Sequence, residues 1–496
     1  MPVVRGVTAS APAFTQPGSH SVDSGSAATL SEQIAQRLAQ QISQRLLAPG
    51  ARLPSVRQAA QHHGVSTSTV VAAYDLLQAR GLVLALPQRG FFVREPLPET
   101  RSASAGGLGT AALPLPPLPP LPPQAPVDAT ALIRSMFQVQ GSKPSPGMGT
   151  LPESWLDAAP LQRALRQVCS RSSQTNDWLR YGEPAGDTRL RQALSRRLAE
   201  LGIAAAPEQF VTTTGATHAL DLVCRTLLQP GDAVLVDDPG WATEFARLSR
   251  QGMRLLPVPR GEHGPDLAVM QTLLQQHRPR VYVTVSVLHN PTGASLSPAA
   301  AHQVLRLAEA HDLTIIEDDT YAWLAPPHAT RLAQLDGLKR TVYVSGFSKI
   351  LTPQWRVGYL AAAPELAQRL IDTKLLTTLT TPAPLEQAVA LCLEQGQLRR
   401  HAERVTTRLA SARARTVRLA HVAGCTFVTP PAGLFGWVDV GTDTEALARA
   451  LLTEGWLTAP GALFHATRRP GTLMRVNFAT AQEARFWQRL VELRQG

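Results

Sequence analysis

A proline-rich segment constrains the fold of this chain more than any other feature. Residues Leu113–Pro126 read LPLPPLPPLPPQAP. Proline fixes φ and lacks an N–H donor, so this run is expected to form an extended spacer of about 3.1 Å per residue. The 496-residue chain is therefore expected to fold as separate units on either side of a linker at 95–135. A ligand for an SH3-type domain is the alternative interpretation of the same prolines.

Cysteine usage and hydropathy exclude several classes of protein. The four cysteines contain no C-x-x-C pair, which argues against a disulfide scaffold or a cysteine zinc site and fits a reducing compartment. No apolar run reaches 18 residues, and the N-terminus lacks the pattern of a secretory signal. We expect a cytoplasmic protein with no membrane span and no metal site.

The basic residues are almost all arginine. The net charge is +11, from 48 basic and 37 acidic residues, and only four of the 48 are lysine. Arginine keeps its proton at ordinary pH, whereas a desolvated lysine can lose it. Any amine chemistry therefore has four candidates. They are Lys143, Lys339, Lys349 and Lys374.

The part of the chain before the linker has the pattern of a small helical domain. Residues 1–28 are rich in Ser, Ala, Gly and Pro and aperiodic, so we expect a disordered tail. Within 29–94, helical patterns begin at Leu30, near Pro54 with Ser55 at the cap, and after Gly64. Two apolar runs, Leu82–Leu86 and Phe91–Val93, then predict a hairpin. Three helices and a hairpin are typical of a winged helix-turn-helix.

Several features of this small domain favour DNA as its partner over the alternative, a helical cap or dimerisation domain. The residues up to Arg94 contain eight arginines against three acids. The hairpin tip carries Arg89 and Gly90. Small hydroxyls, suited to phosphates and base edges, open the third helix. These hydroxyl residues are Ser66, Thr67, Ser68 and Thr69.

These stretches resemble the GntR family of bacterial regulators. The resemblance rests on GARLPSVR at 50–57, HGVSTSTV at 63–70 and PQRGFFV at 87–93. It implies that Arg57 contacts DNA, together with the hydroxyl run at 66–69 and Arg89–Gly90. The family often carries arginine where this chain has Thr67, so this position departs from the direct reading of guanine by an arginine.

After about residue 136 the chain alternates helical patterns with short buried runs. This alternation predicts an α/β fold with a largely parallel sheet and a smaller C-terminal subdomain over 136–496. The expected strands are Gln209–Thr213, Ala233–Val236, Arg280–Val285, Leu313–Glu317 and Thr341–Val344.

Lys349 is the lysine whose surroundings best fit amine chemistry, although an exposed surface lysine is the ordinary interpretation. A Schiff-base lysine needs a desolvated pocket, and its cofactor needs a phosphate clamp and an acid at the pyridine nitrogen. Thr213–Thr217 precedes a helical run and is a candidate phosphate cradle, and His289–Gly293 is a turn after a buried strand. The acid follows another strand, where spacing alone does not choose among three neighbours. These are Glu317, Asp318 and Asp319.

Together, these motifs resemble the fold type I aminotransferases, in the class of the kynurenine and 2-aminoadipate aminotransferases, over about residues 145–496. The resemblance implies pyridoxal 5'-phosphate as cofactor, with Lys349 forming the internal aldimine and Arg475 binding a substrate carboxylate. It places Asp318 at the pyridine nitrogen and Trp241 on the ring, and it assigns Tyr181 to a phosphate across a homodimer interface. Asn290 and Tyr321 are implied at the ring oxygen. The phosphate is assigned to Ala216, Thr217, Ser348 and Arg356. Gly346 and Gln354 depart from the usual motif around the lysine.

The combination of both units resembles the MocR family. The resemblance implies a regulator of transcription that binds DNA and pyridoxal phosphate. An amine or amino-acid effector would be sensed through external aldimine formation at Lys349, changing how a homodimer presents its DNA heads. An aminotransferase with a vestigial or autoregulatory head is the main alternative. A cofactor-free scaffold is a third.

Overall fold

The computed structural model describes residues 29–44, 47–86, 89–94, 145–172 and 179–495. The predicted tail at 1–28 and linker at 95–135 lie outside the described residues, as does Lys143. Contacts divide the chain into two compact units, Met1–Pro119 and Pro120–Gly496. Each unit is described by itself.

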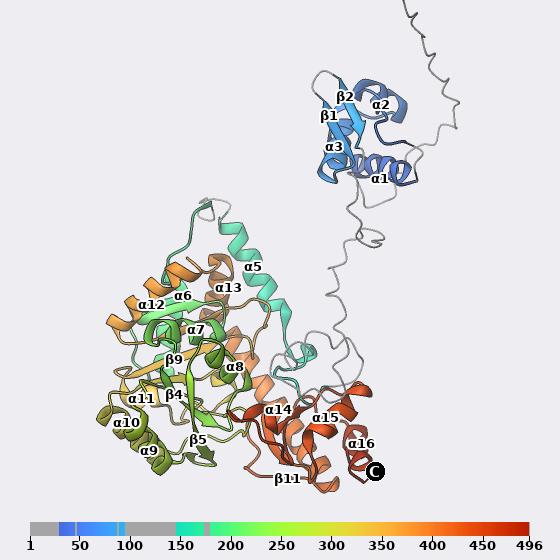
Figure 1. The fold of residues 1–496 in the computed structure, drawn as a ribbon. Helices are drawn as coiled ribbons and strands as arrows, with labels where there is room; N and C mark the ends of the chain where they lie inside the picture. Colours follow the sequence, from blue (N-terminus) through green and yellow to red (C-terminus); the bar gives the residue numbers. More distant parts are fainter. Residues whose placement is uncertain (1–28, 45–46, 87–88, 95–144, 173–178, 496) are drawn as a thin grey trace, which may run out of the picture. The chain divides into compact units, whose positions relative to one another are not determined.

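The N-terminal unit, here called the head, has three helices followed by a hairpin (Figure 1). The helices are α1 (Leu30–Ser43), α2 (Val56–His63) and α3 (Thr67–Ala79), and the antiparallel hairpin pairs β1 (Val83–Leu86) with β2 (Gly90–Val93). The side chains of Thr29, Ser55 and Ser66 cap the three helices by accepting backbone N–H groups. The expected arrangement is confirmed, although α1 ends at Ser43, before the apolar pattern does.

The core of the head joins all three helices to the hairpin. Ile34, Val70, Leu77 and Val83 are buried together. Tyr74 is buried among them and its hydroxyl donates to the Pro54 carbonyl oxygen at 2.9 Å. The entry to α2 is therefore tied to the middle of α3.

An eight-stranded sheet forms the centre of the large unit, with strand order β3-β10-β9-β8-β7-β4-β5-β6. Strands β4, β5, β7, β8 and β9 are parallel, and β10 runs antiparallel to both of its neighbours. All five expected strands are present, with ends shifted by at most two residues. The strands are β3 (Phe210–Thr213), β4 (Ala233–Asp238), β5 (Arg254–Gly261), β6 (Gly264–Pro265), β7 (Val281–Thr284), β8 (Thr314–Asp318), β9 (Thr341–Gly346) and β10 (Gly358–Ala361).

Helices cover both faces of this sheet, because successive strand residues point to opposite sides. Val234 and Val236 of β4 pack in one apolar cluster with residues of α7 (Ala216–Leu227) and α8 (Ala242–Arg250). Leu235 packs in another with residues of α9 (Leu267–His277) and α10 (Pro298–Ala310). The remaining helices of this part of the unit are α5 (Ala158–Ser172), α6 (Thr188–Glu200), α11 (Leu332–Asp336), α12 (Pro364–Thr377) and α13 (Ala383–Glu394).

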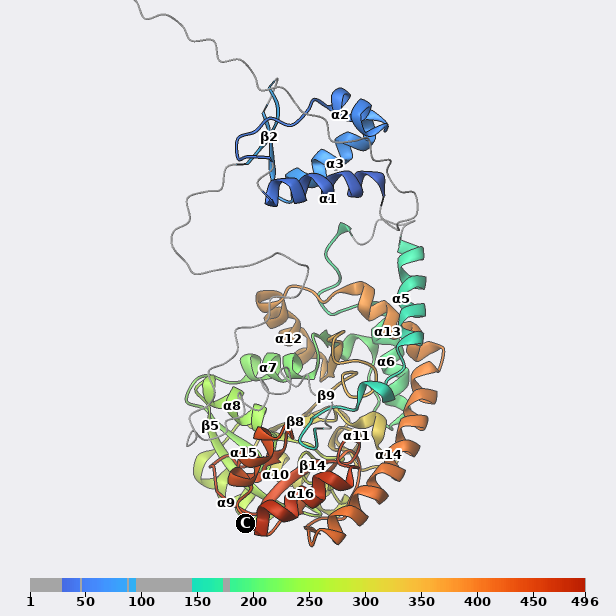
Figure 2. The same cartoon turned by 90° about the vertical axis from the view of Figure 1, so that its right-hand side faces the viewer.

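A smaller C-terminal part follows the 26-residue helix α14 (Gln397–Val422), which runs along the side of the unit (Figure 2). It contains a four-stranded antiparallel sheet in the order β11-β12-β14-β13. The strands are β11 (Thr426–Phe427), β12 (Phe435–Asp439), β13 (Ala459–Pro460) and β14 (Leu473–Asn477), with helices α15 (Thr444–Thr453) and α16 (Ala484–Gln495). No helix in the described part of the chain is long and apolar enough to cross a membrane.

Candidate functional site

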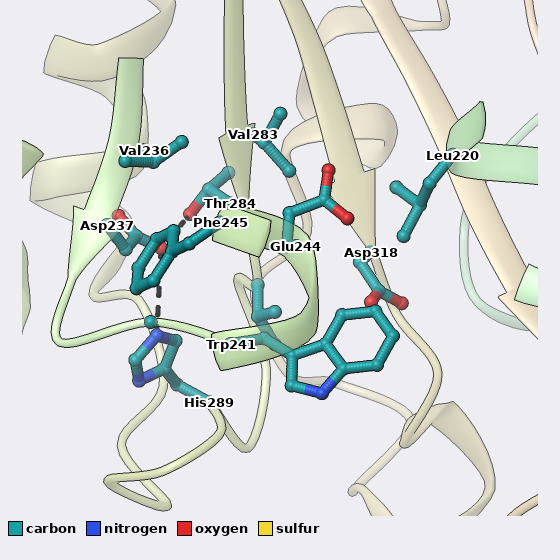
Figure 3. A pocket seen from close by; sticks show the side chains of 12 residues that line it. Leu220, Val236, Asp237, Trp241, Glu244, Phe245, Val283, Thr284, His289 and Asp318 are labelled. Carbon is teal, nitrogen blue, oxygen red and sulfur yellow. Dashed lines mark hydrogen bonds and ion pairs between the residues drawn. The ribbon is translucent and has the colours of Figure 1, made fainter. Parts of the chain in front are cut away.

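The carboxyl ends of the parallel strands meet at one edge of the large sheet and form a pocket (Figure 3). Trp241, which precedes α8, lies in this pocket beside Asp318, the last residue of β8. His289 and Glu244 also line it. The topology therefore brings together residues that are far apart in the sequence, such as Trp241 and Asp318, which are 77 positions apart.

The structure shows which of the three neighbouring acids lines the pocket, a choice that their spacing in the sequence could not make. Glu317 accepts the N–H groups of Leu332 at 2.7 Å and Ala333 at 2.8 Å, so α11 occupies its oxygens. Asp319 pairs with Arg331 at 2.6 Å, and both side chains are buried. Of the three, only Asp318 lines the pocket. Burial raises its pKa to about 6, opposed by hydrogen bonds from Thr320.

Lys349 lies just after β9, and its Nζ donates to the Gly149 carbonyl oxygen at 2.9 Å. Burial lowers the pKa of this amine to about 8, and Arg475 lowers it further while Asp318 opposes the shift. A further contact, which holds the turn that carries Lys349, was not recognised from the sequence. His401 of α14 is buried, and its Nε2 lies 2.9 Å from the carbonyl oxygen of Ile350, so α14 contacts the turn that carries the lysine.

The first turn of α7 lies beside Ser348 and Arg356, which flank Lys349, and this arrangement, here called the cradle, suits an anion. Gly215 precedes the helix with φ +87° and offers no side-chain cap, which leaves the first N–H groups of α7 available. Arg356 donates to Ser348 Oγ at 3.2 Å and to the Thr214 carbonyl oxygen at 3.0 Å. A Cβ at Gly215 would lie 2.4 Å from this guanidinium, so only glycine fits there. The expected residues Ala216, Thr217, Ser348 and Arg356 thus belong to one cradle.

The departure at Gly346 has a structural counterpart at the same cradle. A Cβ at Gly346 would lie 3.3 Å from the Val357 carbonyl oxygen and 3.5 Å from the Ala216 nitrogen. A side chain at this position would therefore lie close to the start of α7. Gly346 leaves that space open, and the remaining donors come from Ser348 and Arg356.

Arg475 and Asn290 meet on the C-terminal side of the site. The buried guanidinium of Arg475 donates to Asn290 Oδ1 at 3.0 Å and to the Gly147 carbonyl oxygen at 2.6 Å. Its Nε is buried without a partner among the described residues. The guanidinium also lies 4.3 Å from the ring centre of Phe435, against which Tyr321 packs edge to face. Burial lowers the pKa of Arg475 to about 10.

These residues fit pyridoxal phosphate, as three features show. A helix N-terminus with Ser348 and Arg356 suits the phosphate, and a half-buried amine of lowered pKa suits an aldehyde. Asp318 has an oxygen facing the pocket beside an indole ring. Among the predicted cofactor-binding residues, Tyr181 does not lie with the others, since its side chain is 82% exposed in the single chain.

A buried polar network at one side of the pocket was not anticipated from the sequence. Asp237 at the end of β4 accepts from Arg260 at 2.9 Å, Thr284 at 2.7 Å and Tyr282 at 2.5 Å. His289 lies 3.8 Å from the same carboxylate, and burial holds its pKa well below the usual range. Arg260, which lies near the end of β5 after an apolar run, was the available signal.

The predicted DNA-binding residues of the head lie at its surface. Arg57 on α2 and Arg89 at the hairpin tip are exposed, and so are Ser66, Thr67 and Ser68 at the start of α3, whereas Thr69 and Gly90 are half-buried. Ser66 Oγ accepts the Thr69 N–H at 3.1 Å. Arg52 was not anticipated. It is exposed and its guanidinium lies beside Gly90, where a Cβ would be 3.4 Å from its Nε.

Comparison with known proteins identifies both units. The model of the bacterial regulatory proteins of the gntR family matches residues 30–93, and the model of aminotransferase class I and II matches residues 146–489. The fold and site thus define a GntR-type DNA-binding domain joined to an aminotransferase-like domain. The chain belongs to the aminotransferase class I and II family and, within it, to the regulators of the MocR type.

Whole-length relatives support this assignment. The HTH-type transcriptional regulator YdcR of Escherichia coli is 30% identical over 90% of this chain and 94% of its own length. The HTH-type transcriptional regulator TauR of Rhodobacter capsulatus is 31% identical over 86% and 89%. The α-aminoadipate aminotransferase LysN of Thermus thermophilus, solved with N-(5'-phosphopyridoxyl)-L-leucine, is 25% identical with a TM-score of 0.66 and covers 73% of this chain and 94% of its own.

These findings confirm the fold class, the family and the cofactor that the resemblance implied. The protein is a transcriptional regulator that depends on pyridoxal 5'-phosphate, and its head binds DNA. The aminotransferase alternative is less favoured, because relatives that match nearly the whole chain are named HTH-type transcriptional regulators.

Proposed function

We propose that the large unit senses a small amine or amino acid at Lys349 and thereby changes how a homodimer presents its two DNA heads. The observation that carries the proposal is the convergence of Lys349, Asp318 and the Arg475–Asn290 pair at one site of a chain that also has a DNA-binding head. We place this regulator in the cytoplasm, with a head at 29–94, a linker at 95–135 and the sensing unit at 136–496.

Each residue of the site has a role in this proposal. Bound pyridoxal phosphate supplies an aldehyde carbon that joins reversibly to amines. Lys349 would hold that carbon and, with a pKa near 8, would give up and take back a proton at Nζ close to neutral pH. Asp318 would hold a proton at the pyridine nitrogen, and Trp241 would lie against the ring. Asn290 and Tyr321 would donate to the ring oxygen, while the cradle of Ala216, Thr217, Ser348 and Arg356 would bind the phosphate.

Arg475 gives the site its preference for a carboxylate. Two of its nitrogens bond protein oxygens and Nε has no partner among the described residues, although the group is buried. A carboxylate that takes over these donors relieves an under-satisfied cation, and such bidentate pairs are strong. An effector with both an amine and a carboxylate therefore fits better than an amine alone.

The second copy of the chain completes the site in this proposal. Tyr181 is exposed together with Leu179, at 82% each, in the segment before α6. A tyrosine on such a surface can reach the phosphate of a partner's cofactor. Effector binding then changes DNA affinity only to the extent that it favours one arrangement of the dimer over another.

The proposal is tested by footprinting DNA upstream of the protein's own gene and its neighbours, with and without amino acids. We expect a protected region whose affinity falls steeply with salt and whose occupancy changes with one effector. Lys349→Ala should abolish the change. The proposal fails if Lys349→Ala leaves both DNA binding and the effector response as they are in the wild type. It also fails if no fragment binds in a salt-dependent way.

Transamination is the second candidate, because every group that the reaction needs lies at the site, including Arg475. Mixing the cofactor-loaded protein with amino acids and recording its visible absorbance separates the two. Rapid, stoichiometric conversion of the cofactor to its amine form favours the enzyme. A lasting adduct without conversion favours the sensor.

A further inference from the structure

Lys374 of α12 is a buried lysine with no role in the site described above. Its side chain is 0% exposed. Its Nζ donates to Thr381 Oγ1 at 3.3 Å and to Thr212 Oγ1 at 3.4 Å, and these two hydroxyls lie 2.9 Å apart. No ion pair of the described residues includes Lys374. Burying an amine with only two hydroxyl partners lowers the stability of the folded protein, so we looked for a functional role of Lys374.

The charged groups around Lys374 come from three further helices. Burial lowers the pKa of the Lys374 amine to about 8. Glu386 of α13 opposes this shift, because it favours the charged ammonium, whereas Arg191 of α6 adds to it. Glu386 is buried, and its Oε1 has no hydrogen-bond partner among the described residues. Burial lowers the pKa of the His218 imidazole in α7, and the nearby charge of Lys374 lowers it further.

The two hydroxyls that Lys374 binds belong to segments that hold a surface loop, Tyr181–Gly186. The Thr212 N–H donates to the Ala185 carbonyl oxygen at 2.9 Å. Gly186 has φ +105°, and a Cβ there would lie 1.8 Å from Thr212 Oγ1. A Cβ at Gly182 would lie 3.5 Å from the Thr381 carbonyl oxygen. The loop therefore packs directly on both partners of the buried amine.

The same amine lies behind the phosphate cradle. Thr212 is two residues before Thr214, whose N–H donates to His218 Nδ1 at 3.1 Å. This bond makes Nδ1 the acceptor and leaves the ring proton on Nε2, which is buried without a partner among the described residues. A neutral histidine in the first turn of α7 thus contacts the segment before the cradle, and it lies close enough to Lys374 for that charge to lower its pKa.

We propose that Lys374 is a positioning residue that couples phosphate binding in the cradle to the conformation of the Tyr181–Gly186 loop. Its ammonium holds Thr212 and Thr381 together and adds attraction for a phosphate dianion. Because coupling is reciprocal, a phosphate in the cradle stabilises the ammonium and so tightens the loop. This inference rests on the proposed cofactor site. It adds a way in which binding of the cofactor changes the conformation of the exposed loop that carries Tyr181.

The experiment compares the full-length protein with K374M, which keeps the length of the side chain but removes its charge and donors. K339M is the matched control, because Lys339 is exposed on another segment. Binding of pyridoxal 5'-phosphate and of pyridoxal, which lacks the phosphate, is titrated by visible absorbance. Hydrogen exchange of the backbone at 181–186 is measured with and without each aldehyde.

We expect K374M to lose about tenfold more affinity for the phosphate-bearing aldehyde than for pyridoxal, and to exchange faster at 181–186. K374R should stay close to the wild type, and T381V, which removes one acceptor, should shift both readouts in the same direction by less. If K374M does not fold, the aldehyde affinities and the hydrogen exchange of T381V and K374R test the inference instead. Equal losses for both aldehydes, or unchanged exchange at 181–186, overturn the inference. If the wild type binds neither aldehyde, the proposed cofactor site itself is wrong.

Discussion

The two units of this protein place their charged groups in opposite ways. The head carries Arg57 and Arg89 at its surface. In the large unit, Arg475 and Asp318 are buried and Lys349 is half-buried, and burial shifts all three pKa values. DNA is a dense polyanion whose contacts exchange for counterions in water, so exposed cations suffice. Reversible bonding to a small aldehyde needs a desolvated amine, and desolvation destabilises the folded protein until a ligand compensates it.

The strongest test of this contrast is the loss of the amine. Lys349→Ala should abolish the visible absorbance of bound pyridoxal phosphate, because neither of the other lysines in the described part of the chain, Lys339 and Lys374, lies in the site. DNA binding without effector should change by less than about threefold, since the head is untouched. Lys339→Ala is the matched control. Retention of the absorbance band in Lys349→Ala would place the Schiff base elsewhere.

Removing the buried cation should have the next largest effect. Arg475→Ala should weaken binding of an effector carboxylate by at least about 100-fold, or roughly 3 kcal/mol, because a desolvated bidentate pair is lost. A panel of amino acids and their decarboxylated amines, titrated by absorbance, measures this. The amines should lose little affinity. Equal losses in both series would mean that Arg475 shapes the pocket rather than binding a carboxylate.

The pH dependence of stability separates the buried amine from an exposed one. Burial lowers the pKa of Lys349 from 10.5 to about 8, so the folded, cofactor-free protein penalises the protonated amine. This penalty is fully present below pH 8 and is lost as pH rises toward 10.5. Lys349→Met should therefore stabilise the large unit by roughly 3 kcal/mol at pH 7 and by less than about 1 kcal/mol near pH 10. Urea denaturation at both pH values measures the difference, and a gain independent of pH would contradict it.

At the head, the loss of one exposed cation should have a smaller effect. Arg57→Gln should lower affinity for the operator by about tenfold and reduce the slope of log K against log salt by about 1. Arg254→Gln, at an exposed arginine of β5, is the control and should leave both unchanged. An unaltered salt slope in Arg57→Gln would remove this residue from the DNA interface.

The smallest effect concerns the cap of α3. Ser66→Ala removes the acceptor for the Thr69 N–H and should destabilise the head by about 1 kcal/mol. Ser68→Ala, at an exposed hydroxyl two residues further on, should cost less. Urea denaturation followed by circular dichroism compares them. Equal costs would show that the cap bond contributes little.

Much of the fold could be predicted from local patterns. The strands at 210–213, 233–238 and 341–346 appear within two residues of their expected positions, because buried apolar runs between turns are readable in sequence. The choice among Glu317, Asp318 and Asp319 could not be made, because it depends on α11 and Arg331 occupying two of them. The burial of Lys374 was equally hidden, since its partners Thr212 and Thr381 come from β3 and from the α12–α13 connection.

The sequence by itself determined the division into a small helical head and an α/β unit, because this follows from local patterns. The resemblance of its motifs to known families implied the cofactor and the lysine that we propose holds it. The tertiary structure decided which carboxylate faces the pocket and that Arg475 meets Asn290 across 185 positions. It also decided that His401 contacts the Ile350 carbonyl oxygen and that Lys374 is buried against Thr212. The physical reason is that burial and hydrogen-bond partnership are properties of packed elements. They arise only when the ends of distant strands and helices are brought to the same edge of the sheet.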